Sequence, residues 1–102
     1  MPFFAGSNMI TGMLEIRLLI REAQSLKDKR RVLKSLKDQI KNKFNVSIAE
    51  VDLLDSHQHA VLGVAAVGND QQFINSVLSK IINHISASHK AELIDYRMEF
   101  YS

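Results

Sequence analysis

The spacing of the apolar residues changes repeatedly along this chain, and this change constrains its fold more than any other feature. Between residues 13 and 20 apolar and polar residues alternate, as expected for a strand with one buried face. From residue 25 to 44 apolar residues recur every three or four positions, as in an amphipathic helix. The same reasoning predicts strands at 46–54 and 60–67, a helix at 71–86 and a strand at 91–101.

This order predicts an α+β protein with the ferredoxin-like βαββαβ fold. In that fold two helices cover one face of a four-stranded antiparallel sheet, and the other face stays open. Ser25 is expected to cap the first helix, with Asp28 as a capping-box-like partner. On the second helix the expected buried residues are Phe73, Val77, Leu78, Ile81, Ile82 and Ile85. The last strand is expected to place Ile94, Tyr96, Met98 and Phe100 on one face, with Tyr96 and Phe100 in the core.

The open face of the predicted sheet should carry more acids than bases. Alternation along the first, second and fourth strands places seven charged side chains there. They are Glu15, Arg17, Glu50, Asp52, Asp95, Arg97 and Glu99. Five acids against two bases should repel phosphate, so we expect any nucleic acid to bind on the helix side.

Length and composition limit the classes of protein to consider. At 102 residues the chain is expected to form one domain, at residues 9–102, with residues 1–8 as a disordered extension or a remnant of an expression vector. There is no Cys, which excludes disulfides and thiolate metal sites. We expect no membrane segment, because no apolar run approaches about 18 residues. The N-terminus does not resemble a signal peptide, so a cytoplasmic location is expected.

The first predicted helix concentrates positive charge. Residues 25–44 hold eight of the thirteen Lys and Arg residues but only two acids, Asp28 and Asp38. Their net charge is +6, and the remainder of the chain sums to −4. Such separation of charge is expected to steer a polyanion or an acidic partner toward this helix.

The basic residues of this helix lie at spacings that bring them to one side. Arg30, Lys34, Lys37 and Lys41 follow one another at i, i+4, i+7 and i+11, and Lys27 and Arg31 widen the stripe. We predict that these six residues bind nucleic acid through its phosphates, as a track along structured RNA, or dock on an acidic protein. The simpler alternative is a solvated helix face that only keeps the domain soluble.

Other uses of this fold find less support. The third strand, AVLGVAAV, has no aromatic residue on which the sheet of an RRM would stack bases. The loop Arg21–Gln24 has an Arg but none of the glycines that an acylphosphatase-type anion cradle needs. Asp55, His57 and His59 form the one metal-like cluster, and whether they bind a metal stays open. We expect no metal, no cofactor and no enzymatic activity.

The residues also carry a resemblance to a known family. The run EAQSLKDKRRVLKSLKDQIKNKFNVSIAEVD, followed by AVLGVAAVGND, resembles the YlxP-like bacterial family of unknown function, over about residues 9–101. The resemblance implies a ferredoxin-like fold and a cytoplasmic protein whose gene lies among those for translation initiation and ribosome maturation. The chain departs from the family pattern at Ser56, His57 and His59, around a shared Gln58.

Two functions follow as expectations. The first is a small binding module associated with RNA or the ribosome, which uses the basic side of the first helix. The alternative is a protein-interaction or homodimerisation module with no nucleic-acid role. It would use the open sheet face or an edge strand, because such surfaces present unpaired apolar area or backbone groups.

Overall fold

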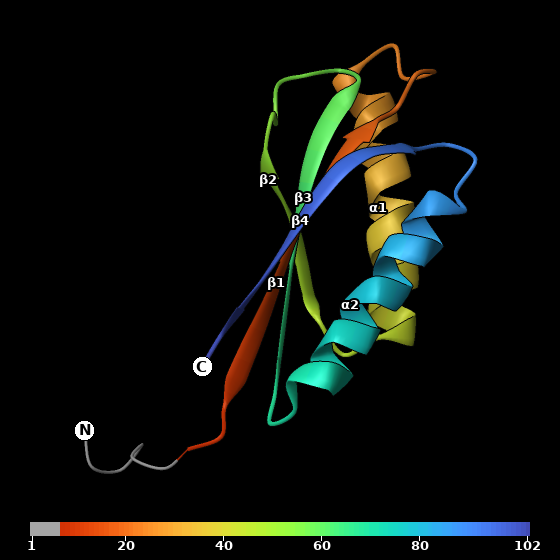
Figure 1. Ribbon diagram of the computed structural model, residues 1–102. Helices are drawn as coiled ribbons and strands as arrows, with labels where there is room; N and C mark the ends of the chain where they lie inside the picture. The colour runs from red at the N-terminus through yellow and green to blue at the C-terminus, as the bar shows by residue number, and fades with distance from the viewer. Residues whose placement is uncertain (1–6) are drawn as a thin grey trace.

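The computed structural model describes residues 7–102, and these form a sheet with helices on one side (Figure 1). The elements are β1 (Ile10–Leu19), α1 (Leu26–Lys43), β2 (Ser47–Asp52), β3 (His59–Gly68), α2 (Gln71–Ser86) and β4 (Glu92–Tyr101). All strand pairs are antiparallel, in the order β2-β3-β1-β4. The predicted ferredoxin-like fold is therefore confirmed. The extension expected at residues 1–8 lies mostly outside the described residues.

Both helices begin where the sequence predicts, because a polar side chain caps each one. The Ser25 hydroxyl accepts a hydrogen bond from the Asp28 N–H at 3.1 Å, and the Asp28 carboxylate accepts one from the Gln24 N–H at 3.0 Å. At the start of α2 the Asp70 carboxylate accepts from the Gln72 N–H at 3.0 Å. These bonds satisfy amides that the first turn of a helix leaves without partners.

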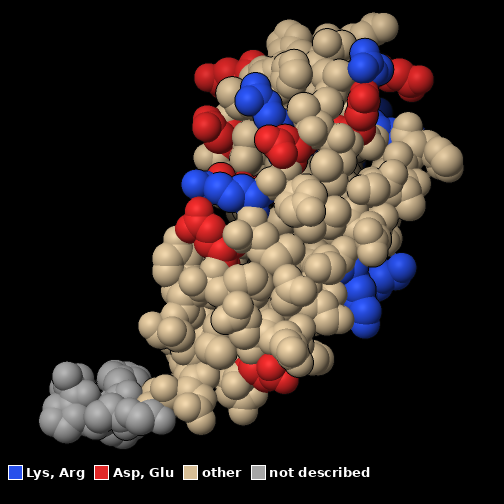
Figure 2. Space-filling model, in the orientation of Figure 1, with Lys and Arg blue, Asp and Glu red and all other residues tan. Residues whose placement is uncertain are grey.

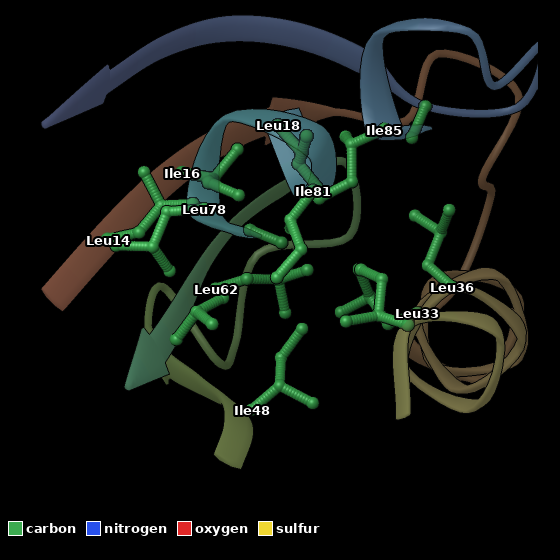
Figure 3. Close-up of a cluster of buried hydrophobic side chains, with 14 of the residues drawn as sticks. Leu14, Ile16, Leu18, Leu33, Leu36, Ile48, Leu62, Leu78, Ile81 and Ile85 are labelled. Atoms are coloured by element: carbon green, nitrogen blue, oxygen red, sulfur yellow. The ribbon is translucent and has the colours of Figure 1, made fainter. Parts of the chain in front are cut away.

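The core lies between the sheet and the helices, and Figure 3 shows it at close range. Alternate residues of β1 point into it, and they meet one stripe of each helix. The most deeply buried apolar residues are Leu14, Ile16, Leu18, Ile20, Leu33, Ile40, Leu62, Ile74, Leu78, Ile81 and Ile85. Burial of aliphatic side chains contributes about 1.5–3 kcal/mol each, so this layer is the main source of stability.

A glycine lets α2 approach the sheet closely. A Cβ atom at Gly12 would lie 2.4 Å from Cγ2 of Ile74 and 3.0 Å from Cδ1 of Leu78. Gly12 sits on the helix side of β1, opposite Phe100 of β4. The missing side chain therefore leaves the space that the first turns of α2 occupy.

The buried face of α2 differs from the prediction at its start. The face consists of Ile74, Leu78, Ile81 and Ile85, whereas Phe73 is 66% exposed. Successive residues of a helix are about 100° apart, so Phe73 falls beside the stripe that begins at Ile74. The prediction that Phe73 is buried was wrong.

The alternation of β4 is broken by a bulge. Arg17 pairs with Asp95 but Leu18 pairs with Leu93, so Ile94 has no partner on β1. Ile94 is 47% exposed as a result, contrary to the expected inward position. Tyr96 does lie on the helix side, opposite Ile16, yet it is 50% exposed because β4 is an edge strand. Its expected place in the core was also wrong.

One lysine of α1 is completely buried. Lys29 has no exposed surface, and its ammonium group lies 2.9 Å from the Leu53 carbonyl oxygen and 3.1 Å from that of His59. The Leu54 carbonyl oxygen is 3.4 Å away. These carbonyls belong to the turn between β2 and β3, where Leu53 adopts a left-handed conformation with φ of 57°. Lys29 therefore fixes this turn against the start of α1.

The charge of Lys29 is balanced by Glu50. Its Oε2 lies 2.9 Å from the Lys29 Nζ, as an ion pair without a well-aligned hydrogen bond. Glu50 faces the helices because it pairs with Leu62, two residues beyond the buried Ile48. Its expected position on the open face was wrong. A bulge after Glu50 then returns Asp52 to the open face.

Replacement of Lys29 by Met should destabilise the protein by about 3–5 kcal/mol, because it leaves Glu50 and the turn carbonyls buried without a cation. Urea denaturation would measure this loss. Lys27→Met is the matched control, since Lys27 is exposed on the same helix and should change stability by no more than about 0.5 kcal/mol. Equal stability of the two variants would refute the role given to Lys29.

Substitutions in the apolar stripe of α1 should lower the stability of the protein by a similar amount. Ile40→Ala removes a fully buried side chain and should lower the free energy of unfolding by about 2–5 kcal/mol. Asn42→Ala, at an exposed position of the same helix, should leave it almost unchanged or raise it slightly. Thermal unfolding monitored by circular dichroism would compare them, and a similar melting temperature for both would contradict this packing.

Candidate polyanion-binding face

The six predicted binding residues lie together on one side of α1. We call this set, Lys27, Arg30, Arg31, Lys34, Lys37 and Lys41, the basic flank. Leu33, Leu36 and Ile40 mark the side of α1 that faces the core. At about 100° per residue, the basic flank occupies a sector about 120° wide that begins beside this apolar side. It extends about 21 Å along the helix, because each residue adds about 1.5 Å.

The basic flank is turned away from the second helix. Nε2 of His84 on α2 lies 2.8 Å from Oε1 of Gln39, which is on the opposite side of α1. α1 packs over β2, an edge strand, so the flank points outward past this edge of the sheet. Five of its residues are exposed and Lys37 is half-buried. Within residues 7–102, nothing therefore covers the flank.

Few carboxylates neutralise the basic flank. Lys34 pairs with Asp38 at 2.7 Å, and this hydrogen bond raises the pKa of Lys34 and lowers the pKa of Asp38. Lys34 thus remains a cation at neutral pH. In the part of the chain that the structure describes, no carboxylate lies within 4 Å of the other five residues. Asp28, the other acid of the helix, caps its start.

The sequence analysis did not separate Lys29 from its basic neighbours. Lys29 lies at i, i+4, i+7 and i+11 with Leu33, Leu36 and Ile40, which is the spacing of the buried stripe. This spacing could have indicated that Lys29 is buried. It places the Lys29 ammonium in the core instead of on the basic flank. A lysine in an apolar stripe requires buried acceptors, which only the folded β2–β3 turn supplies.

The open face of the sheet carries charges of both signs at one end. Figure 2 shows Lys or Arg side chains interleaved with Asp or Glu side chains at the upper left of the molecule. Arg97 pairs with Glu15 of β1 at 3.0 Å and with Glu99 of its own strand at 3.3 Å. With Glu50 turned inward, the face retains Glu15, Asp52, Asp95, Glu99, Arg17 and Arg97. The excess of acid predicted for it is smaller but remains.

The metal-like cluster is not assembled. Asp55 and His57 lie exposed in the β2–β3 turn, whereas His59 begins β3 and is half-buried. Among residues 7–102, no three His, Asp or Glu side chains gather in a way that could hold a metal ion. The structure therefore does not bring the three side chains together.

The loop after β1 places its arginine in an ion pair. Nε of Arg21 lies 2.8 Å from Oε2 of Glu92, at the start of β4. The Gln58 side-chain amide donates to the Arg21 carbonyl oxygen at 2.8 Å, which ties the β2–β3 turn to this loop. In the described residues, no helix is both long and apolar enough to cross a lipid bilayer.

Comparison with solved structures agrees with this topology. The chain is similar to a designed protein, De novo designed protein Foldit4, with a TM-score of 0.55 and 16% identity over 92% of this chain and 97% of that one. De novo designed protein Ferredog-Diesel is similar at a TM-score of 0.49 and 13% identity, over 87% and 83% of the two chains. At these identities the similarity concerns the fold alone.

Comparison of sequences gives closer relatives. The chain is 34% identical over 90 residues to the Uncharacterized protein YlxP of Bacillus subtilis (strain 168), which covers 88% of this chain and 98% of that protein. Residues 11–98 match the model of a family described as Protein of unknown function (DUF503). The chain therefore belongs to the DUF503 family.

Proposed function

We propose that this protein is a small binding module that holds structured RNA, such as ribosomal RNA, by its phosphates. The observation that carries the proposal is the basic flank: six cations on one side of α1, of which only Lys34 has a carboxylate partner among residues 7–102. Clustered like charges on a helix repel one another by a few tenths of a kcal/mol per pair. A bound polyanion relieves this repulsion and releases its own counterions.

The composition of the flank suits phosphate. Arg30 and Arg31 can each hold two phosphate oxygens with one planar guanidinium, whereas the four lysines act as flexible point charges. All six side chains project from a rigid helix whose rotation the core fixes, so only the side chains, and not the backbone, must be ordered on binding. Their length of about 21 Å suits several successive phosphates rather than one small anion.

The choice of RNA over other polyanions has a separate basis. The resemblance of the sequence implies a gene among those for translation initiation and ribosome maturation. The flank itself has no aromatic residue on which a base could stack, and its Lys and Arg side chains extend along one exposed helix side, as suits a row of phosphates. We therefore expect recognition of backbone and shape with little dependence on base sequence.

The proposal predicts that Arg30→Gln, Lys34→Gln and Lys37→Gln together weaken binding to a ribosomal RNA fragment at least tenfold in low salt. The log–log salt dependence of the affinity should also become shallower by about two to three units, since about 0.7–0.9 counterions are released per phosphate contact. Filter binding over a salt series would measure both. Folding should be unaffected, because these side chains contribute no buried contact that a Gln would lose.

The matched control changes the same number of charges elsewhere. Lys43, Lys80 and Lys90 are exposed and lie outside the flank, so replacing all three by Gln alters the net charge equally. Binding of this variant should stay close to that of the unmodified protein. Equal weakening by the two triple variants would show that only net charge matters and would refute a defined site.

A further inference from the structure

The face of the sheet opposite the helices is uncovered by any described residue (Figure 1). Along β3 and β2 this face is apolar, with Val61, Gly63, Ala65, Val67, Ala49 and Val51. The register of the strands shows which residues lie side by side on this face. Met13 of β1 lies beside Ala65 of β3, and Glu15 lies beside Gly63. β1 therefore carries long side chains on this face, whereas the adjacent β3 carries small ones.

The small residues of β3 leave a shallow hollow along the sheet. It has a volume of about 410 Å³ and runs between Met13 on one side and Ala49 and Val51 on the other. Ala65 and Gly63 form its floor, Glu15 also lines it, and Cγ1 of Val51 lies 2.9 Å from the position that a Cβ of Gly63 would take. Val67 continues the apolar surface toward the end of β3 and is 64% exposed. A contiguous exposed surface of this kind, next to charged residues, is typical of an interaction site.

We propose that a second copy of this chain covers the open face, with β1 of each copy lying over β3 of the other. A two-fold axis parallel to the strands, between β3 and β1, produces this arrangement. It places Met13 of one copy above Ala65 of the other, and the same contact forms in reverse. The long side chains of one copy thus fit over the small side chains of the other.

Glu15, in the middle of β1, would lie inside this interface together with its partner Arg97. Arg97 already pairs with Glu15 and Glu99 of its own sheet, so covering them would bury no carboxylate without a cation nearby. Packed sheets cross at about 30°, which makes their corners diverge. Asp52 and Asp95, at the end of the face, would therefore remain in water.

The area of the face is sufficient for a dimer. Strands lie about 4.8 Å apart and rise about 3.3 Å per residue. Three of the four strands have 10 residues, so the face measures about 550 Å² per copy. Two copies would bury at most about 1,100 Å², because the corners of the face stay in water, and this is close to the total of about 1,000 Å² expected for a specific interface.

Other occupants fit this face less well. RNA would meet four acids and two bases, and β3 has no aromatic residue on which a base could stack. An acidic peptide would meet the same carboxylates and bring no cation, whereas a second copy brings Arg17 and Arg97. A second copy brings both the apolar surface and a match in shape, so the observations favour self-association.

The test is sedimentation velocity over a dilution series from about 500 µM to about 1 µM, a range that covers micromolar dissociation constants. The unmodified protein should pass from dimer to monomer on dilution. Ala65→Glu should be a monomer throughout, because it places a carboxylate in the hollow. Ala87→Glu, an exposed position at the end of α2, is the matched control and should dimerise normally.

Further measurements separate the alternatives. Met13→Lys should also prevent dimerisation, and circular dichroism would confirm that both variants fold. The dimer should persist in 1 M salt and in the triple variant of Arg30, Lys34 and Lys37. Failure of the dimer proposal can therefore be distinguished from failure of RNA binding. A monomer at every concentration, a dimer unaffected by Ala65→Glu, or a larger species dissolved by nuclease would each overturn the proposal.

Discussion

The rotation of α1 about its own axis determines the surface chemistry of this protein. Leu33, Leu36 and Ile40 hold one side of the helix against the sheet, and Lys29 fixes its first turn to the β2–β3 turn through three carbonyls and Glu50. A helix turned by 100° would bury part of the basic flank and expose the apolar stripe. Breaking these buried contacts would cost much stability. They therefore hold α1, and with it the cations of the basic flank, in one orientation.

Much of this structure could be predicted from the sequence, because local spacing determines it. The two helices, their polar caps and the six residues of the basic flank all follow from the periodicity of one segment at a time. Apart from Phe73, whose exposure follows from the spacing of its own helix, the errors arose where a partner from another segment decides the outcome. Glu50 faces inward because Lys29 neutralises it there, and Ile94 is exposed because a bulge forms in the pairing with β1. Neither partner is near in the sequence.

Contacts between distant segments also limited the prediction of the candidate site. The charge and spacing of the flank could be predicted, but its exposure could not, because exposure depends on where α2 packs. Gln39 contacts His84 of α2 on the side of α1 opposite the flank, and this contact is between residues 45 positions apart.

The two proposed surfaces lie on opposite sides of the molecule, so each can act without blocking the other. A dimer joined through the open sheet faces would keep both helix layers outside, with a basic flank on each. Two flanks on one particle could bind one RNA molecule together, and the second contact would then form at a high effective concentration. Modest affinity of a single flank for phosphates would thereby become tighter binding to a large folded RNA than to a short fragment. The dimer would matter for function through this geometry, even though its interface touches no RNA.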